Sequence, residues 1–141
     1  MLAIFTLPET DRFASFGTST DRVGLYGISR GGHAALWAAS TGAGVQAVVA
    51  DAPAHRPALT PAPPSSQDVV ARLDAPLLIL HGTADRAIPV EQSREYERTA
   101  RALGKSIAVV YFEGVGHMPS LLPESQIEAR ERAIAFLREK L

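Results

Sequence analysis

The sequence contains no cysteine among its 141 residues. A disulfide scaffold, a thiolate nucleophile and a cysteine-ligated metal are therefore excluded. An excess of charge of one sign is also missing, because 14 basic and 15 acidic residues give a formal net charge of −1. A chain this close to neutral, with a pI near 6.4, has no electrostatic signature for nucleic acid or anionic membranes. We therefore expect neither as a partner.

Long hydrophobic runs are absent too. The apolar stretch Leu2–Leu7 is too short to span a bilayer and follows no basic segment, so it predicts neither a membrane helix nor a signal peptide. The lack of disulfides suits the reducing cytoplasm, where we expect the protein. The remaining composition, 46% hydrophobic and 21% charged residues, is typical of one compact domain, which we expect to comprise residues 1–141.

Short apolar runs recur along the chain, each followed by a helical pattern. The predicted strands are 22–27, 45–50, 76–80 and 107–112, and the predicted helices are 31–40, 66–73, 90–103 and 123–141. The strands are continuously apolar, as in parallel strands covered on both faces. This alternation predicts an α/β fold with a mostly parallel sheet of four to five strands and helices on both faces.

Apolar residues at helical spacing in the last two predicted helices are expected to face the core. These residues are Tyr96, Ala100, Leu103, Ile127, Ile134, Leu137 and Leu141. Residues 52–64, with five prolines, are too stiff and too poor in N–H donors for a helix or an inner strand. In this connector, His55, Arg56 and Leu59 either contact a substrate or are solvated.

The pentapeptide Gly27-Ile28-Ser29-Arg30-Gly31 lies between a predicted strand and a predicted helix. G-x-S-x-G in this context is the nucleophile elbow, in which a sharp, strained turn exposes the serine hydroxyl. Gly27 and Gly31 allow the strand and the helix to approach without an intervening Cβ atom. The motif predicts that Ser29 is a nucleophile, whereas a glycine-rich turn with an inert serine is the alternative.

A serine nucleophile needs a base, and four histidines are available. His117 lies on a glycine-flanked loop after the last predicted strand, from which it can reach over the carboxyl edge of the sheet. His81 ends a strand and is expected to make structural hydrogen bonds. His33 is expected to be a solvated or packed helix residue and His55 a solvated loop residue, so that glutamine at either position changes turnover by only a few-fold.

The base needs an orienting acid, and the order Ser, Asp, His fits Asp85. Asp85 lies just past the third predicted strand, between the strands that lead to Ser29 and His117. Its structural alternative is a turn or capping aspartate. Asp51 and Glu113, which follow the second and fourth strands, are rival acids.

These residues resemble the α/β-hydrolase superfamily, through Asp21–Gly32, His81-Gly82-Thr83-Ala84-Asp85 and Gly114-Val115-Gly116-His117. The dienelactone-hydrolase-like enzymes and the catalytic domains of prolyl-oligopeptidase-type peptidases are the most similar branches. The resemblance covers about residues 20–141. It implies Ser29 as nucleophile, Asp85 as acid, His117 as base and the backbone N–H of Arg30 as one oxyanion donor, with no metal and no cofactor.

The chain departs from these families before the elbow. Family members place several strands there, and the second oxyanion donor follows one of them, whereas this chain has an atypical segment, residues 1–20. The elbow strand would therefore have an unpaired edge. We expect Leu2–Leu7 to pair with that edge, and two copies to associate through it. The N–H of Glu9 or Thr10, or a partner chain, would supply the missing donor.

The expected function is hydrolysis of small carboxylic esters through an acyl-enzyme. Alternatives are a peptidase or amidase of the prolyl-oligopeptidase type, and a weak or inactive remnant without a complete oxyanion hole. A nucleotide-binding module is disfavoured, because Gly24, Gly27 and Gly31 do not space as G-x-G-x-x-G and no P-loop lysine follows.

Overall fold

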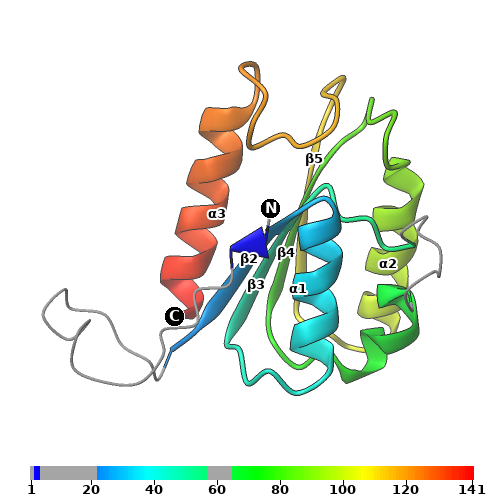
Figure 1. Cartoon of the computed structure of the whole chain (residues 1–141), viewed down its shortest axis with the longest axis vertical. Helices are drawn as coiled ribbons and strands as arrows, with labels where there is room; N and C mark the ends of the chain where they lie inside the picture. Colours follow the sequence, from blue (N-terminus) through cyan, green and yellow to red (C-terminus); the bar gives the residue numbers. More distant parts are fainter. Residues whose placement is uncertain (1, 4–21, 57–64) are drawn as a thin grey trace, which may run out of the picture.

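A computed structural model describes residues 2–3, 22–56 and 65–141, and it contains one five-stranded sheet (Figure 1). The strands are β1 (Leu2–Ala3), β2 (Gly24–Ile28), β3 (Ala47–Asp51), β4 (Leu77–Gly82) and β5 (Ile107–Phe112). They lie in the order β1-β2-β3-β4-β5, with β2 to β5 parallel and β1 antiparallel to β2. The predicted α/β fold with a mostly parallel sheet is confirmed.

Helices cover both faces of this sheet. They are α1 (Arg30–Ser40), the 3₁₀ helix η2 (Ser66–Arg72), α2 (Val90–Ala102) and α3 (Gln126–Lys140). Figure 1 shows α3 on one face, with α1 and α2 on the other. Each face has its own apolar cluster, centred on Leu36, Ile79 and Tyr96 under α1 and α2, and on Leu78 and Leu80 under α3.

Every residue of β3 and β4 is buried. These two strands lie in the middle of the sheet, and helices cover both of its faces. Register pairs Ile28 with Asp51, and Asp51 with Leu80. The carboxyl ends of these strands therefore meet at one edge, where the loops that follow them lie side by side. No helix within the described ranges combines the length and apolar character needed to cross a bilayer.

Two predicted helices differ from the structure. Residues 66–72 form a 3₁₀ helix that begins with a capping box, in which Ser65 and Asp68 satisfy each other's backbone donors. The last helix begins at Gln126 instead of Pro123. Its start is fixed by Leu122, whose carbonyl accepts from the N–H groups of Ser125 and Gln126.

The predicted apolar faces were partly wrong. Tyr96 and Ala100 are fully buried, but Leu103 is exposed at the end of α2. On α3 the buried residues are Ala129 and Ala133, whereas Ile127 and Ile134 are 71% and 49% exposed. Leu137 packs against the same cluster as these alanines, as predicted. The small alanines let α3 lie close to the sheet, and the isoleucines fall on the outer face.

The N-terminal run pairs with the elbow strand as predicted at two positions, Leu2 with Gly27 and Ala3 with Tyr26. The rest of this run, residues 4–7, lies outside the described residues, as do Glu9 and Thr10. The connector is described as far as Arg56 and again from Ser65, so the predicted role of Leu59 also lies outside the described part.

Candidate active site

Ser29 lies in the turn between β2 and α1, where the sequence predicted an elbow. Its backbone has φ 55° and ψ −117°, a combination that residues other than glycine rarely adopt. The Ser29 N–H donates to the carbonyl of Asp51 at 2.8 Å, which ties the turn to β3. A Cβ atom on Gly27 would lie 2.1 Å from the carbonyl oxygen of Gly31. The elbow therefore requires glycine at position 27, as predicted.

His117 is carried by a loop that crosses the end of β4. The loop is fixed by the N–H of Ala84, which donates to the carbonyl of Val115 at 2.9 Å. This approach depends on Gly82, since a Cβ atom there would lie 2.2 Å from the same Val115 oxygen. The loop is thereby held where His117 reaches over the carboxyl edge of the sheet.

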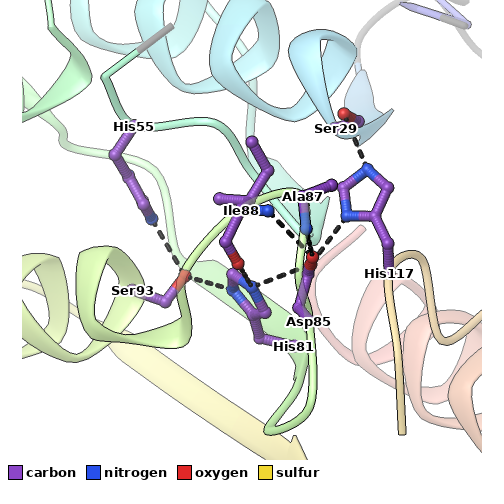
Figure 2. A network of polar contacts seen from close by, with 8 residues as sticks. All are labelled: Ser29, His55, His81, Asp85, Ala87, Ile88, Ser93 and His117. Atoms are coloured by element: carbon purple, nitrogen blue, oxygen red, sulfur yellow. Dashed lines mark hydrogen bonds and ion pairs between the residues drawn. The ribbon is translucent and has the colours of Figure 1, made fainter.

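Ser29, His117 and Asp85 form a continuous hydrogen-bonded chain (Figure 2). Nδ1 of His117 lies 2.6 Å from Oδ2 of Asp85, and Nε2 of His117 lies 3.0 Å from Oγ of Ser29. An ionised carboxylate can only accept, so Nδ1 carries the proton. In the neutral ring, Nε2 then presents its lone pair to the serine hydroxyl. The structure thus brings together the three residues that the sequence singled out.

Asp85 lies in the tight turn before α2, with its side chain fully buried. Its Oδ1 accepts from the N–H groups of Ala87 and Ile88, each at 2.8 Å. Burial alone would raise the pKa of Asp85, but the hydrogen bonds from Ile88, His117 and Ala87 outweigh it and hold the pKa below its usual value. These contacts favour an ionised carboxylate with a fixed orientation.

The rival acids have other surroundings. Asp51 is completely buried, and its Oδ2 accepts from the backbone N–H and the hydroxyl of Ser120. Burial raises the pKa of Asp51, although the Ser120 hydrogen bonds oppose the change. Glu113 is exposed on its loop. Among the described residues, the carboxylate hydrogen-bonded to His117 is that of Asp85.

The other histidines are all buried. His33 packs against Trp37 in α1, within the range of roles expected for it, and burial lowers its pKa. The solvated position expected for His55 was wrong: only 1% of it is exposed, and it stacks on Tyr96 with ring centroids 4.5 Å apart. His81 makes structural hydrogen bonds, as expected, to Ser93 and to the carbonyl of Ile88.

Sequence reasoning missed the serines that bond to these histidines. Ser93 bridges His55 and His81, and Ser66 contacts the other side of His55. A signal existed for Ser93, which shares helical spacing with the buried residues Tyr96 and Ala100. A serine on an otherwise apolar helix face needs a buried polar partner.

Arg30 is the first residue of α1. Its backbone N–H belongs to the first turn, where a helix supplies no acceptor, and it directly follows Ser29 in the chain. In the described ranges, no group of three or more histidine, aspartate or glutamate side chains is arranged to hold a metal ion.

Comparison with known proteins places this chain in a family. Residues 9–135 match the sequence model of the Dienelactone hydrolase family. Esterase LipC of Mycobacterium tuberculosis is 36% identical over 68 residues, which are 48% of this chain and 17% of that protein. A Klebsiella pneumoniae structure described as a dienelactone hydrolase has a TM-score of 0.76 and 23% identity, over 89% of this chain and 55% of that one.

Acylaminoacyl peptidase of Pyrococcus horikoshii has a TM-score of 0.78 and 20% identity, over 88% of this chain and 25% of its own. The chain thus spans about half of the Klebsiella protein and about a quarter or less of the other two relatives. The structural likeness places the fold among the α/β-hydrolases. Because the family match extends over most of the sequence, the chain belongs to the dienelactone hydrolase family.

Proposed function

We propose that the chain is a serine hydrolase that cleaves small carboxylic esters through an acyl-enzyme, with Ser29, His117 and Asp85 as its catalytic residues. The observation that supports this most directly is the continuous chain of contacts, 3.0 Å from Ser29 Oγ to His117 Nε2 and 2.6 Å from His117 Nδ1 to Asp85 Oδ2. Nucleophile, base and acid are thus already within hydrogen-bond reach.

In the first half of the reaction, Ser29 Oγ attacks the carbonyl carbon of the ester while its proton moves to Nε2 of His117. Asp85 keeps the ring in the Nδ1–H tautomer and stabilises the imidazolium that forms. His117 then gives this proton to the leaving alcohol, and the acyl group remains on Ser29. Water repeats the sequence, with His117 as base, and releases the acid and the free serine.

The tetrahedral intermediates carry negative charge on the former carbonyl oxygen. We assign the N–H of Arg30, at the positive end of α1, as a donor to that oxygen. Removing a single donor of this kind typically lowers kcat by about 10²- to 10³-fold. We assign the second donor to the N–H of Glu9 or Thr10, or to a partner chain.

Esters with small acyl groups are the substrates we favour. The His117 ring is 20% exposed and Ser29 is partly exposed in the described structure, so a small ester could reach both. A relative named an esterase supports ester over amide cleavage. A peptidase or amidase activity is the second candidate, because acylaminoacyl peptidase shares the fold.

The test combines covalent labelling with turnover. A fluorophosphonate probe should label the wild-type chain and leave Ser29→Ala unlabelled. Hydrolysis of p-nitrophenyl acetate and butyrate should exceed that of aminoacyl p-nitroanilides, and faster anilide cleavage would favour the peptidase. A folded wild-type chain that neither reacts with the probe nor cleaves these esters would be an inactive remnant, and the proposal would be wrong.

A further inference from the structure

Behind Asp85, on the side away from His117, lies a row of buried polar side chains that the proposed reaction does not use (Figure 2). We call it the buried histidine chain. It consists of His81, Ser93 and His55, which Figure 2 draws, and of Ser66, which contacts the far side of His55. Each of these residues is at most 1% exposed. They come from β4, α2, the connector after β3 and η2, so the chain joins four separate elements behind the site.

The proton on His81 can be located from its neighbours. Nε2 of His81 lies 3.0 Å from the carbonyl oxygen of Ile88 and 3.2 Å from Oδ2 of Asp85. Both neighbours can only accept, so Nε2 must carry the proton. Burial lowers the pKa of His81, which favours the neutral ring. Nδ1 is then an acceptor, and it receives the hydroxyl proton of Ser93, whose Oγ lies 2.7 Å away.

The other protons of the buried histidine chain can be assigned in the same way. Ser93 donates its only hydroxyl proton to His81, so its Oγ accepts from Nε2 of His55 at 3.1 Å. Nδ1 of His55 in turn accepts from the Ser66 hydroxyl at 2.9 Å. Burial lowers the pKa of His55 to about 3, so this ring is neutral as well. The reversed pattern would turn a nitrogen lone pair of His81 toward the Asp85 carboxylate, which is repulsive.

We propose that the buried histidine chain positions Asp85, with His81 as the residue that acts directly on it. Nε2–H of His81 faces Oδ2, the oxygen that accepts from His117, at 3.2 Å. The same N–H donates to the carbonyl of Ile88, and the backbone N–H of Ile88 donates to Oδ1 of Asp85. One ring therefore restrains both oxygens of the carboxylate, and Ser93 and His55 fix the orientation and tautomer of that ring.

This inference rests on the proposed function, in which Asp85 must keep its orientation while His117 gains and loses a proton. A purely apolar core would fill the same space without desolvating two imidazoles and two hydroxyls. In this proposal, His81, Ser93 and His55 are positioning residues, because they touch neither the substrate nor the reacting atoms.

The first test reads the protons directly in the wild-type chain. Long-range ¹H–¹⁵N correlation spectra of ¹⁵N-histidine-labelled protein, assigned with single His→Gln variants, report the tautomer of each of the four histidines. At pH 7 we expect His81 and His55 both neutral and protonated on Nε2. An Nδ1–H tautomer or an imidazolium at His81 would overturn the proposal. The tautomers are read in the wild-type chain and do not depend on activity, and the His→Gln variants serve only to assign the resonances.

The second test removes one hydroxyl, with a matched control. Ser93→Ala breaks the chain between the two histidines, whereas Ser40→Ala removes an equally buried hydroxyl that has no hydrogen-bond partner among the described residues. Ser93→Ala removes two hydrogen bonds, of which the one to Nδ1 of His81 orients the ring beside Asp85. With p-nitrophenyl acetate, the loss of that orienting bond should lower kcat about tenfold. KM should stay within about twofold, and Ser40→Ala should match the wild type.

A spectroscopic readout separates positioning from general loosening. The short His117–Asp85 hydrogen bond should place its shared proton far downfield in the ¹H spectrum. Ser93→Ala should shift or broaden that resonance, and Ser40→Ala should leave it unchanged. Equal kcat and an equal resonance in the two variants would overturn the proposal. A wild-type chain that shows the expected tautomers but neither reacts with fluorophosphonate nor cleaves esters would instead refute the proposed function alone.

Discussion

At the scale of single residues, backbone strain gathers around the groups that carry the proposed chemistry. Ser29, Ala52 and Met118 are the residues other than glycine that have positive φ in the described ranges, at 55°, 46° and 64°. Ala52 follows Asp51, whose carbonyl accepts from the Ser29 N–H at 2.8 Å, and Met118 follows His117. Such conformations cost about 1–3 kcal/mol each and persist only where neighbouring contacts fix them. The bond from Ala52 N–H to the Leu80 carbonyl, at 2.7 Å, is one such contact.

Ser29 and His117 should act as a unit. Ser29→Ala should abolish fluorophosphonate labelling and lower kcat by about 10⁴-fold or more, and His117→Ala should do nearly as much. The double variant should lose little more, because either single change already removes the nucleophile–base pair. Steady-state kinetics of the three variants with p-nitrophenyl butyrate measure this. Losses that multiply in the double variant would mean that the two residues do not cooperate.

The two buried aspartates at the edge of the sheet should differ sharply. Asp85→Asn should lower kcat about 10³- to 10⁴-fold, because an amide that donates to Nδ1 favours the wrong tautomer of His117. Asp51→Asn retains an acceptor for Ser120 and makes no bond to His117, so kcat should stay within about tenfold. Comparing kcat of the two variants shows which aspartate orients His117. A larger loss from Asp51→Asn would make Asp51 the acid.

Residue order along the chain was enough to predict that Ser29, Asp85 and His117 come together. Each follows a different parallel strand, and such strands end at one edge of the sheet. The position of His55 could not be predicted in this way. Its proline-rich surroundings indicate a surface loop, but Ser66 and Ser93, from helices later in the chain, fold over it. Burial of that kind depends on contacts between distant segments.

At the scale of elements, the site depends on how closely the His117 loop lies on β4. Gly82→Ala would place a Cβ atom 2.2 Å from the carbonyl of Val115. We expect this variant to lose about 2 kcal/mol or more of stability and to lower kcat about 100-fold, because the loop must shift. Thermal unfolding and kcat for p-nitrophenyl acetate measure the two effects.

Gly116→Ala is the matched control in the same loop. The Cβ atom added there would have Leu122 Cδ1 as its nearest neighbour, at 3.6 Å, which is an ordinary contact. Its stability and kcat should stay close to those of the wild type. If Gly82→Ala behaved like Gly116→Ala, close contact between the loop and β4 would not be what positions His117.

Element prediction worked best where one pattern dominates. The fully apolar runs predicted β3 and β4 to within two residues at each end, and β5 was predicted over the residues it occupies. The face of α3 was predicted correctly at Leu137, which packs against the core. It was misjudged at Ile127 and Ile134, which have the spacing of a core stripe but are exposed, whereas Ala129 and Ala133 pack against the sheet. Hydrophobicity alone favours the larger residues, but close helix–sheet packing favours the smaller ones.

At the scale of the whole molecule, buried histidines make stability depend on pH. Burial lowers the pKa of His55 to about 3 in the folded chain, whereas histidine in an unfolded chain has a pKa near 6.5. Between these values the unfolded state binds a proton that the folded state does not, so stability falls as pH drops below about 6.5. His33, His81 and Asp85, whose pKa values are also lowered, act in the same direction, whereas the raised pKa of Asp51 opposes it.

We expect the free energy of unfolding to be lower at pH 4.5 than at pH 7.5, with His55 alone contributing on the order of 2 kcal/mol. Urea unfolding at the two pH values measures the difference. In His55→Gln the difference should shrink by that amount, because glutamine does not titrate. In His33→Gln, which removes a less deeply buried histidine, the difference should shrink by less. If the pH dependence were unchanged in His55→Gln, burial would not lower the pKa of His55, and the folded chain would bind a proton there at pH 4.5.

The outer edge of β2 leads to the last prediction. In the described structure, β2 is the outermost of the parallel strands, and β1 covers its edge at Tyr26 and Gly27. A strand edge that is covered by so short a strand can associate with other chains. We therefore predict that the 141-residue chain forms a homo-oligomer through this edge. Deleting Met1–Leu7 would remove β1, expose more of the edge next to Ser29, and cause aggregation together with loss of esterase activity.

Size-exclusion chromatography with light scattering, followed by p-nitrophenyl acetate turnover, tests the deletion. The exposed face of α3 is the competing interface, so Ile127→Lys combined with Ile134→Lys is the control. This control should leave the mass and the turnover of the full chain unchanged, because it alters α3 and not the β2 edge. A control that dissociates the oligomer would place the interface on α3. A deletion variant that stays monodisperse, monomeric and fully active would show that the edge of β2 needs no cover, since neither pairing nor catalysis would then depend on it.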